Sequence, residues 1–181
     1  KAFLVNLWAG EAVLDLAHPF VRLSVSAPIL NIANAYLGMC SKFRAWRLET
    51  TIPTPPGARA RSSQRWHRDE EARKLVKVFL YLNDVDAEGG PFTYLRYAHE
   101  GGRWRKVFPA VPPRGTLAMP GDEDQKIPPG DIEVMTGRAG TLILQHVGGE
   151  RSRVESGGID VRFEGCGDDR GVGVNDGCHR H

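Results

Sequence analysis

A histidine and an aspartate two residues apart, His67 and Asp69, are the side chains of this sequence best suited to chemistry; they lie in the run Gln-Arg-Trp-His-Arg-Asp at 64–69. In an extended strand, residues two apart project to the same side, so an imidazole and a carboxylate can converge on one point. With a distant second histidine they would form a facial set of three ligands, which holds Fe(II) and leaves adjacent positions open. Taken alone, the tripeptide is more typical of a surface strand with two solvated polar groups.

The sequence around this pair resembles the phytanoyl-CoA dioxygenase family from about residue 10 to about residue 146, most specifically over 64–94. The shared features are the Trp-His-x-Asp run, an apolar strand at 75–82, an acidic turn at 83–86 and a Gly-Gly-Pro-Phe bend at 89–92. The later run Gly-Arg-Ala-Gly-Thr-Leu-Ile-Leu at 137–144 looks like the family strand that leads toward the second iron histidine.

This resemblance implies a double-stranded β-helix, that is, a jelly-roll barrel with flanking helices, which holds Fe(II) in its mouth. It also implies that dioxygen and the co-substrate 2-oxoglutarate are consumed, that succinate is formed, and that a small-molecule substrate is hydroxylated. His67 and Asp69 are then two of the iron ligands.

The resemblance is less complete in the second half of the site. In the family, the distal histidine follows Gly140 of the later strand by about eleven residues, a position held here by Arg151, which stays protonated and cannot ligate iron. We expect His146, six positions after Gly140, to be the third ligand, although a strand-end histidine without a metal is the alternative. The family arginine that grips 2-oxoglutarate lies about eleven residues further on, which predicts Arg162, with Arg153 as its competitor.

Two explanations of this departure are open. The chain is either a family member whose last third has diverged, or a shifted reading frame follows Leu144; translating the DNA in all three frames distinguishes them. Two other classes of protein are alternatives to the dioxygenase: a catalytically inactive relative that acts as a small-molecule-binding or interaction module, and a cupin-like jelly roll with another metal.

Hydrophobic periodicity predicts the elements that position these residues. We expect helices at 11–17, ended by His18-Pro19, and at 28–37, ended by Gly38. Strands are expected at 43–52, 75–82, 92–97 and 140–144, with an alternating run at 158–163. The Gly- and charge-rich segment 99–131 is expected to be a loop over the mouth of the site.

This order of elements predicts one domain at 1–164, with helices within about 11–39 and a barrel over about 42–164. The Gly-, Asp- and Arg-rich sequence from 148 onward predicts little packed structure, and 165–181 is expected to be a disordered tail. Alternation alone leaves open whether Lys77 faces solvent or the interior of the barrel.

Composition limits the class of protein. A chain of 181 residues with 41% hydrophobic residues and a net charge of +2 is typical of a single globular domain, without the basic runs of a nucleic-acid-binding protein. No run approaches the roughly 20 apolar residues that span a membrane. Three cysteines without framework spacing favour a reduced, cytoplasmic location, and the residues Cys166, Cys178, His179 and His181 match no zinc pattern.

Overall fold

The computed structural model describes residues 4–7, 15–52, 55, 57–59, 64–67, 75–98, 101–106, 127–147, 151–153 and 158–165. The chain is mainly β, with helices α1 (Pro19–Ser24) and α2 (Ala27–Leu37). The strands are β1 (Leu4–Asn6), β2 (Ser41–Thr51), β3 (Leu75–Leu80), β4 (Phe92–Leu95), β5 (Ile132–Met135), β6 (Leu142–Val147), β7 (Arg151–Arg153) and β8 (Gly158–Gly165). Short 3-10 turns occur at Arg103–Lys106 and Pro129–Asp131.

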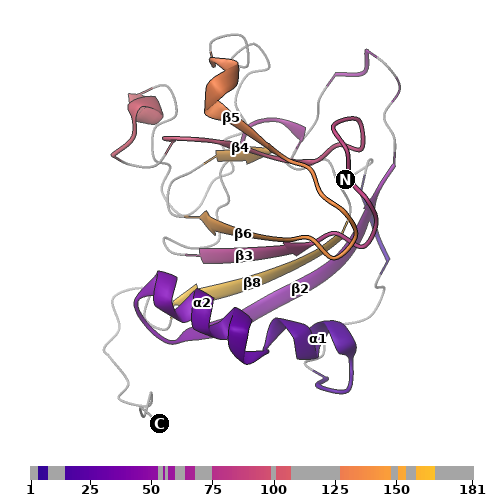
Figure 1. Cartoon of the computed structure of the whole chain (residues 1–181), viewed down its shortest axis with the longest axis vertical. Helices are drawn as coiled ribbons and strands as arrows, with labels where there is room; N and C mark the ends of the chain where they lie inside the picture. The colour runs from indigo at the N-terminus through magenta and orange to yellow at the C-terminus, as the bar shows by residue number, and fades with distance from the viewer. Residues whose placement is uncertain are drawn as a thin grey trace.

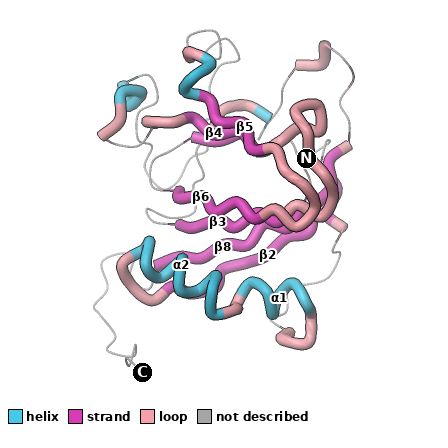
Figure 2. The backbone as a smooth tube through the Cα atoms, viewed as in Figure 1, coloured by secondary structure: helices cyan, strands magenta, loops and turns pink. Residues whose placement is uncertain are grey.

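The strands form two antiparallel sheets, one in the order β1-β2-β8-β3-β6 and one in the order β5-β4-β7. The helices cover one face of the larger sheet, and the smaller sheet lies across its other face (Figure 1). Figure 2 shows the same three layers by element type. Among the described residues, no strand pairing joins the two sheets into a closed barrel.

The helix predicted at 28–37 is confirmed as α2, and Gly38 ends it with a left-handed φ of 70°. The helix predicted at 11–17 is wrong over 15–17, where the chain forms a turn; 11–14 lie outside the described residues. His18-Pro19 does not end a helix but begins α1, because proline at the first helical position needs no N–H partner and His18 is extended before it.

The larger sheet has an apolar outer face. The buried residues that pack there with the helices are Trp46 of β2, Val76 and Val78 of β3, and Val161 and Phe163 of β8. Because successive strand residues point to opposite faces, Leu75, Lys77 and Phe79 of β3 face the smaller sheet. Lys77 is therefore an interior residue. The sequence had left open whether it faces solvent or the interior.

A second core lies between the sheets and contains Tyr81, Val85, Phe92 and Ile143. The Tyr81 hydroxyl donates to the carbonyl oxygen of Met135 at 2.7 Å and accepts the Phe92 backbone N–H at 3.0 Å. Tyr81 follows β3 of the larger sheet, whereas its two partners belong to β5 and β4 of the smaller one. Its hydroxyl therefore joins the two sheets.

The prediction of little packed structure from 148 onward is wrong for 158–165, where the alternating run noted at 158–163 is confirmed as a strand. These residues form β8, which pairs along its length with β2 and with β3 in the middle of the larger sheet. Strands β5 and β7 were not predicted, because each is short and lies at an edge of the smaller sheet. Residues 166–181, the predicted tail, lie outside the described residues.

Candidate functional site

Three polar side chains form a row on the inner face of the larger sheet. Lys77 of β3 pairs directly with Gln145 of β6 on one side and with Arg162 of β8 on the other. All three are buried, with exposed fractions of 4%, 4% and 8%. Directly opposed residues on neighbouring strands share a face, so the strand pairing itself brings these side chains together.

Lys77 and Arg162 place two cationic side chains on adjacent strands in the interior. Cβ atoms of directly opposed residues lie roughly 5 Å apart, so the two side chains start from neighbouring points on the same face of the sheet. A guanidinium can hold both oxygens of a carboxylate at once, and an ammonium can donate a further hydrogen bond. Such a row can bind a carboxylate; the role of Arg162 as the anchor of 2-oxoglutarate, which the resemblance implies, stays a prediction.

His67 is buried, with 8% of its surface exposed, and its Nδ1 lies 2.9 Å from the Arg65 carbonyl oxygen. A carbonyl oxygen can only accept, so this contact favours the tautomer that carries its proton on Nδ1. The lone pair is then on Nε2, which is the form of the ring that binds a metal. Asp69, the second predicted ligand, lies outside the described residues.

Trp66, the residue before His67, packs in the core and thereby holds His67 in place. Trp66 is 3% exposed and belongs to a buried cluster with Leu95, Ala98 and Ile127, against which Trp104 packs. The Trp104 indole N–H donates to Oδ2 of the buried Asp131 at 2.8 Å, and Arg103 forms an ion pair with the other carboxylate oxygen. The Trp66–His67 segment is thus held against β4 and the start of β5.

Of the other candidate residues the structure describes the backbone only. Position 146 pairs with Val76, one residue along β6 from the row of Gln145, and position 153 pairs with Thr93. Position 151, where the family carries its distal histidine, pairs with Leu95, a member of the Trp66 cluster. His146 as a metal ligand and Arg153 as a carboxylate anchor stay predictions.

Within the described residues, which omit Asp69, no group of three or more histidine, cysteine, aspartate or glutamate side chains is placed to hold a metal ion. Within the same part of the chain, no helix is long and apolar enough to cross a membrane.

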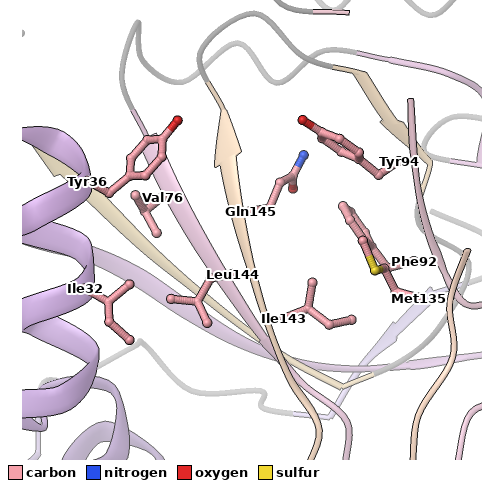
Figure 3. Close-up of a pocket in the computed structure, with 9 residues that line it drawn as sticks. All are labelled: Ile32, Tyr36, Val76, Phe92, Tyr94, Met135, Ile143, Leu144 and Gln145. Atoms are coloured by element: carbon pink, nitrogen blue, oxygen red, sulfur yellow. The ribbon is translucent and has the colours of Figure 1, made fainter. Parts of the chain in front are cut away.

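A pocket of about 340 Å³ lies across β6, the edge strand of the larger sheet (Figure 3). On the helix side its walls are Ile32, Tyr36, Val76 and Leu144. On the inner side they are Phe92, Tyr94, Met135, Ile143 and Gln145. No sequence pattern pointed to this pocket, since its walls come from α2 and from strands far apart in the chain.

Gln145 is a polar residue of this pocket to which no sequence pattern pointed. Neither its amide nitrogen nor its amide oxygen has a hydrogen-bond partner, although both are buried. The available signal was a single glutamine in the apolar strand Leu-Ile-Leu-Gln, in phase with Ile143. That signal alone does not separate a buried amide from a solvated one.

The chain matches no protein-family model, and no curated protein matches it. The assignment of a function therefore depends on the geometry of the Lys77–Arg162 pair, on the environment of His67 and on the pocket at β6.

Proposed function

We propose that this chain is an Fe(II)- and 2-oxoglutarate-dependent dioxygenase of the phytanoyl-CoA dioxygenase type, which hydroxylates a small molecule. The observation that carries the proposal is the buried pair of Lys77 and Arg162 on adjacent strands. A dicarboxylate co-substrate needs a desolvated cationic anchor, and Arg162 is the residue for which the resemblance predicts that role.

The residues fit the proposed metal and co-substrate in two respects. The Nδ1 contact of His67 leaves Nε2 in the form that binds Fe(II), and Asp69 supplies the carboxylate that such a site needs. The guanidinium of Arg162, with the ammonium of Lys77 beside it, matches a carboxylate of 2-oxoglutarate. When bound, the iron with dioxygen and 2-oxoglutarate supplies the oxidising power for hydroxylation.

The residues of the chain itself bind and orient the co-substrate and exclude water from the site. Arg162 and Lys77 fix one end of the co-substrate, and the Trp66 cluster keeps the His67 imidazole in place. The apolar core between the sheets limits the access of water to the site. The order of strands also supports a jelly roll, because β3 to β8 pass repeatedly between the two sheets.

Anaerobic titration tests the proposal. Fe(II) is added to the protein with 2-oxoglutarate, the metal-to-ligand charge-transfer absorption is followed, and succinate is measured after oxygen is admitted. We expect the band and succinate in the wild type, and loss of both in His67→Ala. Arg162→Met should weaken 2-oxoglutarate binding, whereas Arg47→Met, an exposed arginine on β2, should not. A wild-type protein with neither band nor succinate would rule the dioxygenase out.

A catalytically inactive relative is the second candidate, because Arg151 stands where the family has its distal histidine. This candidate predicts that 2-oxoglutarate or another carboxylate binds through Arg162 without any requirement for metal. The same titration, repeated without iron by calorimetry, separates the two candidates.

A further inference from the structure

The pocket at β6 differs chemically from the cationic row beside it. None of the described residues that line the pocket is charged, and most are aliphatic or aromatic. Its volume of about 340 Å³ is at the lower end of the range for small-molecule sites. The surroundings therefore favour a compact, neutral and largely apolar ligand over an anion.

Gln145 brings a buried amide, a directional polar group, to this pocket. Figure 3 shows the Gln145 side chain on the side of β6 that faces Tyr94, Phe92 and Met135, with its amide nitrogen toward Tyr94. The residue is 4% exposed and both of its amide atoms lack a partner. Burying an amide without partners is unfavourable, so native proteins rarely leave one in this state unless a ligand or a water satisfies it.

An amide side chain offers a donor and an acceptor side by side. A ligand group that pairs with the donor and the acceptor of the Gln145 amide at once must itself present an N–H next to a carbonyl. A lactam or a primary carboxamide does so. Aromatic side chains on both sides of β6, Tyr36 and Phe92, suit a ring attached to that group.

We propose that the β6 pocket binds the substrate through Gln145, and that this substrate is a neutral, ring-bearing molecule with a lactam or carboxamide group. Naming the ligand a substrate rests on the dioxygenase function proposed above; the binding itself does not. Gln145 adjoins Lys77 in the strand register, which places the substrate pocket next to the co-substrate anchor.

Three probes and two variants test the binding without metal or co-substrate. The probes are 4-phenylpyrrolidin-2-one, its N-methyl derivative, which has lost the N–H donor, and the anion 3-phenylbutanoate. Affinities are measured by calorimetry and by saturation-transfer NMR on the wild type, on Gln145→Met, and on Leu142→Met, which changes the same strand outside the pocket.

The wild type should bind the lactam about tenfold more tightly than the N-methyl lactam, as expected for one buried hydrogen bond, and should bind the anion least. That preference should disappear in Gln145→Met and persist in Leu142→Met. Equal affinities for the two lactams in the wild type, or an unchanged preference in Gln145→Met, would overturn the proposal. Displacement of the lactam by 2-oxoglutarate alone would also overturn it, because the pocket would then belong to the co-substrate.

This experiment separates failure of the pocket from failure of the dioxygenase. A Gln145-dependent preference for the lactam supports the pocket even if the iron titration shows no band. A charge-transfer band without any lactam preference would support the dioxygenase and refute the pocket.

Discussion

Replacing Gln145 with methionine should make the unliganded protein more stable. Methionine has nearly the same length and flexibility as glutamine but carries no group that needs a hydrogen bond. In the wild type, both amide atoms of Gln145 are buried without partners, and the residue is 4% exposed. Folding therefore removes this amide from water without compensation.

The size of the effect follows from that desolvation. An unsatisfied buried polar group costs about 1–3 kcal/mol, and we expect Gln145→Met to raise the free energy of unfolding by this amount. For a chain of this size each kcal/mol corresponds to a rise in Tm of about 2–4 °C. A gain of stability from the loss of a polar group is typical of residues retained for binding.

Urea denaturation and thermal melting followed by circular dichroism measure this change. Leu142→Met, 39% exposed on the same strand, serves as the control and should alter stability by less than about 0.5 kcal/mol. An unchanged or lower stability of Gln145→Met would refute the reasoning, since the amide would then have partners in solution.

Three further predictions concern the core and the cationic row. Tyr81→Phe should lower the free energy of unfolding by about 1–3 kcal/mol in urea titrations, because it unpairs two backbone groups of the smaller sheet; a loss below about 0.5 kcal/mol would contradict the bridging role. Gly102→Ala should cost about 1–3 kcal/mol, because its Cβ would overlap the Tyr97 carbonyl, whereas the matched Gly130→Ala meets no atom within 4 Å and should be nearly neutral in the same melts. Lys77→Met should raise the Kd for 2-oxoglutarate about tenfold or more, as measured by calorimetry; unchanged affinity would remove Lys77 from the anchor.

Local patterns predicted much of the frame of the site. The strong strand at 75–82 is confirmed as β3, the helix at 28–37 as α2, and the alternating run at 158–163 as part of β8. These predictions succeeded because period, capping glycine and β-branched content act over a few residues. Weak edge strands such as β5 carry no comparable signal, and their existence depends on a neighbour with which to pair.

The candidate site was predicted only in part. Sequence patterns pointed to His67 and Arg162, and the structure describes both as buried. They did not point to Gln145, since nothing local distinguishes a buried amide from a solvated one. Asp69 lies outside the described residues and the side chain of His146 is not described, so both stay predictions.

The sequence by itself determined the strongly patterned strands, such as the one at 75–80, and which residue types can do chemistry, because both depend on neighbours along the chain. Only the tertiary structure decided that Lys77 faces inward, and that it lies between Gln145 and Arg162. A strand's alternation has two equivalent phases, and only pairing with β6 and β8 and packing against α2 select one of them. The cationic row and the adjoining pocket are therefore properties of strand register, which no single segment of the sequence contains.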